Sequence, residues 1–270
     1  MRKVLGLVAV CFAVFALATP VLAGEAESPI LSRIVKTGKL RVGMTGDQPP
    51  LNVMSKSGEI IGLEADLANL LASSMQVDLE IVQKPFAQLL PAVEKGEIDL
   101  VMSGVTITPE RNMRVAFVGP YFVSGKSILT KSKTLAAASG AETINEASVS
   151  LVALEASTSA RFVEMVLPKA KLTTVDGYDA GVKFVIDGKA DALVADYPIC
   201  VLSVLRFPEA ALATLLTPLT IEPIGIALPA NDALFINLVQ NYLGALQSTR
   251  VLDSLRKRWM EDGSWLSQLP

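Results

Sequence analysis

A pattern of helix, Gly-x-x-Asp turn, short apolar strand and polar loop occurs twice in this chain of 270 residues. The first copy reads Gly-Glu-Ile-Asp-Leu-Val-Met-Ser-Gly at 96–104, and the second reads Gly-Lys-Ala-Asp-Ala-Leu-Val-Ala-Asp at 188–196. Asp196 therefore stands in the second copy where Gly104 stands in the first. Helices that alternate with buried strands are typical of α/β proteins, which all repeat their elements. The shared four-residue turn goes further, and it predicts two similar lobes with a cleft between them.

The loop after the first copy collects groups that can hold a carboxylate. Gly104 lets the backbone approach a ligand closely, and Thr106 adds a hydroxyl. The Pro-Glu pair at 109–110 suits the first turn of a helix, so Arg111 follows at a helix start beside the carboxyl end of a strand. Ligands bind at that edge of open α/β sheets, and a guanidinium can grip a carboxylate with two hydrogen bonds. The alternative is a solvated arginine at a helix start.

The first 23 residues have the pattern of a bacterial secretory signal peptide. A basic Met-Arg-Lys start precedes an apolar stretch over 4–18, and Val-Leu-Ala at 21–23 supplies the small residues of a cleavage site. The apolar stretch is too short to span a membrane, and no later stretch qualifies. We therefore expect cleavage after Ala23 and a soluble periplasmic protein. Cys200 is then the one remaining cysteine, and its apolar surroundings predict a buried small hydrophobe.

Charge and composition exclude several classes of function. The formal net charge is −3, which is not the basic surface of a nucleic-acid binder. The sequence contains no histidine, so it has no histidine-based triad, no imidazole acid–base catalyst and no histidine metal site. We expect no nucleic-acid partner, no metal, no cofactor and a monomeric protein.

The predicted strands and helices divide between two lobes. We assign 24–123 and 222–270 to the first lobe and 124–221 to the second. The segment 131–147 is rich in Ala, Ser, Gly and Thr, and this composition predicts a surface connection between the lobes. An extended run at 222–228 is predicted to return the chain to the first lobe.

Some local expectations concern the first lobe. Residues 35–38 are predicted to turn into the first strand. An amphipathic helix is predicted over 64–75, with Leu70 among its buried residues. Glu64 and Asp66 lie at its start, where a helix favours acids, and we interpret this as their whole role. An acidic pair that binds a cation is the alternative.

An ordered set of motifs resembles one known family. The motifs are Gly-Lys-Leu-Arg-Val-Gly at 38–43, Gly-Leu-Glu-Ala-Asp at 62–66, Ser-Gly-Val-Thr-Ile-Thr-Pro-Glu-Arg at 103–111, Pro-Tyr-Phe at 120–122, the stretch 188–196 and Glu-Pro-Ile-Gly-Ile-Ala at 222–227. Together they resemble the periplasmic solute-binding proteins of polar amino acid ABC importers, bacterial family 3. The resemblance runs from about residue 34 to the C-terminus.

The resemblance implies a type II periplasmic-binding-protein fold. In that fold each lobe is a mixed sheet flanked by helices, and two hinge strands join the lobes. The lobes close over an L-amino acid, which the protein delivers to an inner-membrane ABC permease with which it associates transiently. The family's function is binding, so no catalytic residue is expected.

The resemblance also assigns roles to the ligand's two charged ends. Arg111 is similar to the arginine that holds the ligand α-carboxylate. Gly104 and Thr106 match positions that contact the α-ammonium and the carboxylate. Asp196 matches the carboxylate of the second lobe that takes the ammonium. One guanidinium and one carboxylate in opposite lobes suit a zwitterion, and they make binding and closure one event.

Further positions complete the implied site. Ser157 and Thr158 match residues at a helix N-terminus whose N–H groups complete the carboxylate site, with Ala156 in the place of a usual glycine. Phe86 matches a wall residue. Gln48 stands where the family usually has an aromatic that stacks over the ligand side chain.

The side-chain specificity follows from one further departure. Family members that take cationic amino acids often have Asp at the position of Thr45, while Asp47 is nearby but is expected to point differently. We therefore expect a polar or small neutral side chain.

An enzyme is the competing class. Periplasmic cyclohexadienyl dehydratases share this fold, and their resemblance rests on Thr-Gly-Asp at 45–47, Met-Ser-Gly at 102–104 and Asp-Gly-Lys-Ala-Asp at 187–191. Such an enzyme needs a carboxylic acid aimed at a leaving hydroxyl, for which Glu222 and Glu155 are the candidates. Glu222 as an interlobe contact and Glu155 as a surface residue are the alternatives. A receptor sensor domain is a third class, disfavoured because no transmembrane or signalling segment follows in this sequence.

Overall fold

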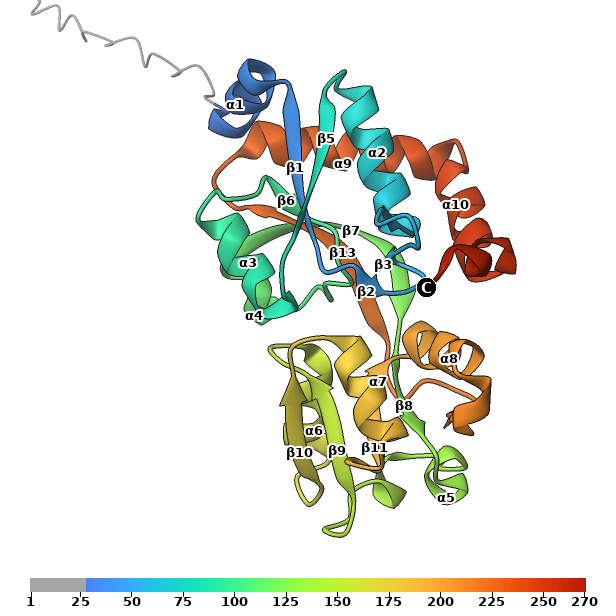
Figure 1. Ribbon diagram of the computed structural model, residues 1–270. Coiled ribbons are helices and arrows are strands. Elements are labelled where there is room, and N and C mark those ends of the chain that lie inside the picture. Colours follow the sequence, from blue (N-terminus) through green and yellow to red (C-terminus); the bar gives the residue numbers. More distant parts are fainter. Residues whose placement is uncertain (1–27) are drawn as a thin grey trace, which may run out of the picture.

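Two five-stranded sheets organise the computed structural model, which describes residues 28–270 (Figure 1). The predicted signal peptide lies outside the described residues. The first sheet has the order β5-β1-β6-β13-β7, formed by β1 (Lys39–Met44), β5 (Asp78–Gln83), β6 (Leu100–Val101), β7 (Val115–Ser124) and β13 (Glu222–Pro229). The second has the order β10-β9-β11-β8-β12, formed by β8 (Lys126–Thr130), β9 (Ser150–Leu154), β10 (Lys171–Val175), β11 (Ala192–Asp196) and β12 (Ala213–Thr214).

Both sheets mix parallel and antiparallel pairs, as predicted. Strand β1 is parallel to β5 and β6, whereas β13 is antiparallel to β6 and β7. In the second sheet β9 is parallel to β10 and β11, whereas β8 is antiparallel to β11. We call each sheet with its helices a lobe. The predicted α/β class with two mixed sheets is confirmed.

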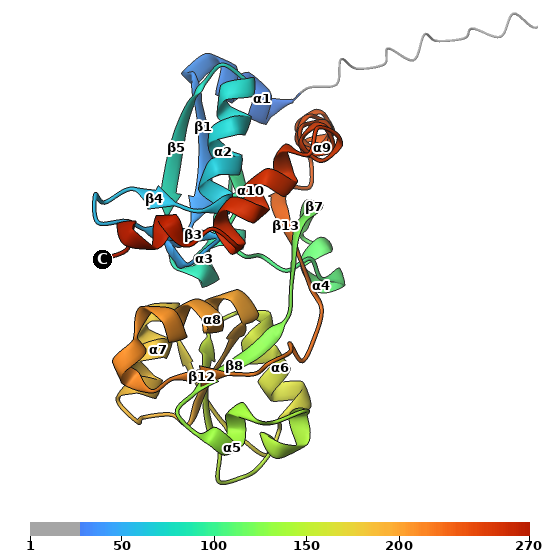
Figure 2. The same ribbon diagram turned by 90° about the vertical axis from the view of Figure 1, so that its right-hand side faces the viewer.

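Helices flank both sheets (Figures 1 and 2). The first lobe contains α1 (Pro29–Thr37), α2 (Leu63–Ser74), α3 (Phe86–Glu94), α4 (Pro109–Asn112), α9 (Ala233–Ser248), α10 (Val251–Met260) and the 3-10 helix η3 (Gly263–Gln268). The second contains α5 (Lys133–Ala136), η1 (Ala141–Thr143), α6 (Thr158–Val166), α7 (Tyr178–Ile186), α8 (Tyr197–Arg206) and η2 (Pro208–Ala210). A small antiparallel sheet of β2 (Asp47–Gln48), β3 (Asn52–Met54) and β4 (Ile60–Ile61) borders the first lobe. Among residues 28–270, no helix combines the length and apolar character that crossing a membrane requires.

The turn predicted at 35–38 is wrong, because helix α1 runs through it. Ser28 caps the helix by accepting a hydrogen bond from the Leu31 N–H, and Pro29 stands at the first position. Gly38 ends the helix with φ of +67°. The sequence does contain the boundary signals of this helix, a Ser-Pro start and a Gly end, and the turn prediction rested on the Gly end alone.

The chain passes between the lobes in extended segments, and the prediction for 131–147 is therefore wrong. That segment lies between β8 and β9, which belong to the same sheet, so it stays within the second lobe. The crossings lie after Ser124 and before Glu222, which pair with each other. Gly125 is required there because a β-carbon would collide with the carbonyl of Thr220. The crossing was predicted at the wrong place because small polar residues indicate any surface loop, whereas the strands that do cross have the same sequence pattern as other strands.

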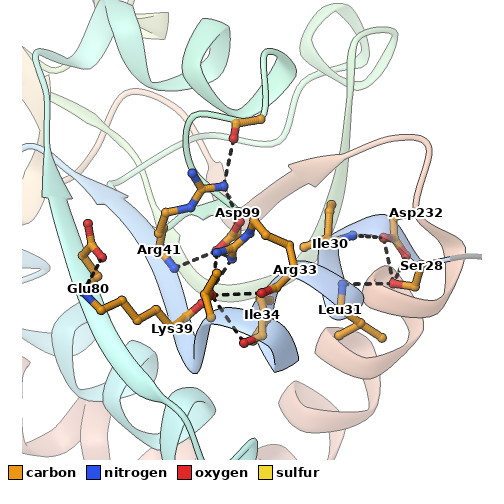
Figure 3. Close-up of polar contacts among 12 residues, drawn as sticks. Ser28, Ile30, Leu31, Arg33, Ile34, Lys39, Arg41, Glu80, Asp99 and Asp232 are labelled. Atoms are coloured by element: carbon orange, nitrogen blue, oxygen red, sulfur yellow. Dashed lines mark hydrogen bonds and ion pairs between the residues drawn. The ribbon is translucent and has the colours of Figure 1, made fainter.

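Aspartates of the repeated turn fasten each sheet. Asp99 accepts hydrogen bonds from the Arg41 backbone N–H at 2.7 Å and its guanidinium at 2.9 Å, and it also pairs with Arg33 (Figure 3). In the second lobe Asp191 accepts the Ser150 N–H at 2.7 Å. In both lobes the aspartate before one strand binds the start of its parallel neighbour, which explains why the pattern occurs twice.

The hydrophobic core spans both lobes. One buried cluster includes Phe86 and Val105 of the first lobe together with Tyr178 and Cys200 of the second. Cys200 is fully buried, as predicted, and burial raises the pKa of its thiol to about 12. Leu70 differs from its prediction, since it is 37% exposed.

Candidate functional site

Arg111 lies where the two lobes meet. The hydroxyl of Thr108 caps helix α4 and holds the Arg111 N–H at 3.2 Å. The guanidinium donates to the carbonyl of Thr106 in its own lobe at 3.0 Å and to that of Ala156 in the other lobe at 3.1 Å. Its carbon lies 5.6 Å from the centre of the Phe86 ring, and Phe86 is 8% exposed.

The Arg111 guanidinium is partly buried at this interface. Burial lowers its pKa, and the more distant carboxylates of Glu222 and Asp196 act in the opposite direction. Among the described residues, no carboxylate forms an ion pair with it. A partly buried cation whose partners are neutral carbonyls is suited to an anionic group from outside the chain.

Hydroxyls of the two lobes meet beside Arg111. Thr106 and Thr158 lie with their oxygens 3.2 Å apart. The neighbouring Ser157 is used differently, because its hydroxyl accepts the Ala160 N–H at 3.1 Å and donates to the Leu154 carbonyl at 2.6 Å. Thr158 therefore faces the first lobe, whereas the side chain of Ser157 serves as the N-cap of α6.

Ala156 has a φ of +57°, in the left-handed region that favours glycine. It forms the turn between β9 and α6 and offers its carbonyl to Arg111. A side chain in this conformation costs roughly 1–2 kcal/mol.

We expect Ala156→Gly to raise the free energy of unfolding by about 0.5–1 kcal/mol, because relief of this strain exceeds the added entropy of the unfolded chain. Urea denaturation of the ligand-free protein measures the change. Gln76→Gly is the matched control, since Gln76 has φ of +55° in the turn that follows α2. A loss of stability in Ala156→Gly together with a gain in Gln76→Gly would show that the Ala156 methyl group makes a contact the site needs.

Asp196 is not a free carboxylate. The ammonium of Lys126 lies 2.6 Å from one Asp196 oxygen and 3.6 Å from an oxygen of Glu222. Lys126 is 1% exposed and Asp196 is 4% exposed, so the cluster is almost dry. Lys126 belongs to this candidate site, and the sequence analysis did not identify it. It faces Asp196 in the register of β8 and β11, and only the pairing of these strands reveals that relation.

Gln48 and Gly104 lie against each other in the first lobe. Gln48 is 1% exposed, and its amide nitrogen lies 3.4 Å from the Ser103 hydroxyl. Gly104 has φ of +60°, and a β-carbon there would collide with the Gln48 side-chain oxygen. The Gly104 N–H donates to Glu64 at 2.7 Å, so it is already occupied within the lobe.

The role predicted for Glu64 and Asp66 is therefore wrong. Glu64 is fully buried, and Asp66 accepts the indole N–H of Trp259 at 2.7 Å. A carboxylate near a helix N-terminus needs no partner beyond water, which is why the sequence pattern suggested nothing more. The first turn of α2 packs beneath neighbouring segments, and both acids bind groups there.

A cavity of about 370 Å³ opens at the edge of the lobe interface, lined by Thr45, Asp47, Gln83, Lys84, Pro85, Asp176 and Gly177. Asp47 accepts the Tyr178 N–H from the other lobe at 2.7 Å, and burial raises the pKa of its carboxyl. Glu110 and Arg161 also form an ion pair between the lobes. With these contacts in place, the lobes are closed on one another.

Two mixed α/β sheets, two connecting crossings and a polar interface define a type II periplasmic-binding-protein fold. The description "Bacterial extracellular solute-binding proteins, family 3" matches residues 40–262, and the chain belongs to this family. The resemblance inferred from the sequence motifs is confirmed.

Three similar proteins illustrate the range of the family. The cyclohexadienyl dehydratase of Pseudomonas aeruginosa is 27% identical over 237 residues, which are 88% of each chain. An ancestral amino acid-binding protein, described as a precursor of cyclohexadienyl dehydratase, has a TM-score of 0.78 at 33% identity and covers 86% of this chain and 99% of its own. An ABC transporter binding component from Wolinella succinogenes, complexed with lysine, has a TM-score of 0.80 at 33% identity and covers 85% and 99%.

Proposed function

We propose that this chain binds an L-amino acid between its lobes in the periplasm and delivers it to an inner-membrane ABC permease. The observation that carries the proposal is the half-buried Arg111 guanidinium at the lobe interface, which has neutral carbonyls as its partners. In those contacts only the donor is charged, and a ligand carboxylate would replace them with a two-pronged pair in which donor and acceptor are both charged. The two carbonyls come from opposite lobes, so Arg111 senses closure as well as ligand.

The α-ammonium of the ligand would share Asp196 with Lys126. Lys126 holds one oxygen of Asp196, which leaves the other for the ligand. A second cation this close opposes a cationic ligand side chain, and Thr45 offers a hydroxyl in place of a carboxylate. These features support a polar or small neutral side chain. The lysine bound by the Wolinella succinogenes protein makes cationic amino acids the main competitors.

A dehydratase is the second candidate, and a specific cluster favours it. Lys126, Asp196 and Glu222 place two carboxyl groups and an ammonium together at the lobe interface. In a dehydratase, Asp196 or Glu222 would be the group that delivers a proton to the leaving hydroxyl while the substrate loses its carboxyl group as carbon dioxide. Glu155, the other candidate acid, is exposed. The similarity to cyclohexadienyl dehydratase adds to this case.

A thermal-shift screen of refolded, ligand-free protein tests the proposal. The screen contains the common amino acids, prephenate and arogenate. A ligand at 100 times its Kd adds about 2.7 kcal/mol to folding, which raises the Tm of a protein this size by roughly 5–10 °C. We expect one or two amino acids to give such a shift, and Arg111→Ala to abolish it.

An activity assay runs beside the screen. If no amino acid shifts the Tm and the protein turns over prephenate or arogenate, the binding function is rejected and the dehydratase function is accepted. Silence in both experiments would reject both candidates.

A further inference from the structure

A buried carboxylate, Glu64, receives three hydrogen bonds from three different parts of the first lobe. One oxygen accepts the Gly104 N–H at 2.7 Å and also the Tyr121 hydroxyl. The other accepts the side-chain amide of Asn52. Glu64 and Asn52 are fully buried, and so is Tyr121, so water does not compete for these bonds. Burial raises the pKa of Glu64, whereas the three donors act to lower it.

Each of these donors belongs to a segment that forms or supports the candidate site. Gly104 belongs to the loop that leads to Thr106 and Arg111. Asn52 connects Glu64 to the loop 45–48, because its side-chain oxygen accepts the Gly46 N–H at 2.6 Å and the Thr45 hydroxyl at 3.2 Å.

The third donor connects the carboxylate to the crossing between lobes. Tyr121 lies on β7, three residues before the chain leaves the first sheet at Ser124. Its own carbonyl accepts the Arg256 side chain at 2.8 Å. Figure 1 shows β2 and β3 at the end of the first lobe that faces the second, with β7 running past them to the crossing.

We propose that Glu64 is a positioning residue of the ligand site, which holds the loops 45–48 and 103–106 at a fixed separation and fastens both to strand β7. Its effect on affinity rests on the proposed function, whereas its effect on loop geometry does not. Glu64 contacts no ligand in this proposal. It acts through Gly104 and Asn52, because these two residues hold the loops 103–106 and 45–48, which contact the ligand in the proposed site.

The chemistry of the contact provides a sharp substitution. Glu64→Gln replaces one accepting oxygen by an N–H₂ group. In one orientation this donor faces the donating amide of Asn52, and in the other it faces the Gly104 N–H and the Tyr121 hydroxyl. Asn52 cannot rotate its amide to compensate, because its oxygen is engaged by Gly46. Adding Asn52→Asp restores the hydrogen bond between residues 52 and 64, since the new carboxylate accepts from the introduced glutamine amide on one side and from Gly46 on the other. The double variant also has the charge of the original pair.

Hydrogen exchange at the Gly104 amide, followed by NMR in the ligand-free protein, is the first readout. We expect Glu64→Gln to speed this exchange at least tenfold and the double variant with Asn52→Asp to return it to within about threefold of the original. Tyr121→Phe removes one donor without changing charge and should give an intermediate effect. These results need no ligand, so they stand even if the proposed function fails.

The second readout is the Kd of the amino acid identified by the thermal-shift screen, measured by calorimetry. We expect Glu64→Gln to weaken binding at least tenfold and the double variant to recover it to within about threefold. Unchanged exchange and unchanged affinity in a folded Glu64→Gln variant would overturn the proposal. Should that variant not fold, failure of the folded double variant to match the original in both readouts would overturn it as well. A purely structural carboxylate would lower stability without this rescue pattern.

Discussion

Arg111→Ala is expected to weaken amino acid binding at least about 30-fold while leaving the protein folded. Removing one partner of a desolvated, hydrogen-bonded charge pair costs about 2–5 kcal/mol, and every 1.4 kcal/mol is tenfold in Kd. Without the guanidinium the ligand carboxylate would be buried against the Thr106 and Ala156 carbonyls, which repel it. Calorimetric titration of refolded protein measures the loss.

The variant should remain folded although it loses some stability. Arg111 makes hydrogen bonds to two carbonyls and stacks on Phe86, and these contacts together account for a few kcal/mol, which is less than the roughly 5–15 kcal/mol of a typical folded protein. Arg111→Lys keeps the charge but loses the two-pronged geometry, so we expect it to bind more weakly than the original and better than Arg111→Ala.

Arg161→Ala is the matched control for the Arg111 variants. Arg161 also pairs across the lobes, with Glu110, but its side chain is 54% exposed. An exposed pair contributes at most about 1 kcal/mol, so affinity should change by no more than a few fold. Micromolar affinity retained by Arg111→Ala would reject Arg111 as the carboxylate-binding residue.

Lys126→Met is expected to be the most destabilising single substitution at the lobe interface. The side chain of Lys126 is 2% exposed, and its ammonium separates the carboxylates of Asp196 and Glu222. Methionine fills a similar volume but leaves the buried Asp196 and the partly buried Glu222 without their cation. Breaking a buried pair in this way costs about 3–5 kcal/mol.

Urea denaturation of ligand-free protein measures this loss. Lys126→Met combined with Asp196→Asn removes the pair as a whole, so we expect it to regain at least about half of the stability lost by Lys126→Met alone. Lys189→Met is the surface control, because Lys189 is 60% exposed beside Asp187 and should change stability by less than about 1 kcal/mol. A Lys126→Met protein within about 1 kcal/mol of the original would mean that the carboxylates have other compensation.

The candidate site was only partly visible in the sequence. Thr108, Pro109 and Arg111 form a helix start, because a capping hydroxyl, a proline and the residues after them act within a few positions of each other. The same local logic predicted β6 and β11, the short apolar strands of the repeated pattern. It could not show that Gly104 has given its N–H to Glu64, since those residues meet only when α2 packs beneath the loop.

Short-range chemistry is thus what the sequence by itself determined about this protein. Turn glycines, capping hydroxyls and the period of apolar residues fixed two α/β units, and the ordered motifs identified the family. The tertiary structure alone decided which group each charged side chain faces. Lys126 faces the carboxylate of Asp196, and Arg111 faces the neutral carbonyl of Ala156. These partners are 70 and 45 residues apart in sequence. Whether a charge is paired depends on distances of a few ångströms and on the exclusion of water, and both exist only after the strands have paired and the lobes have met.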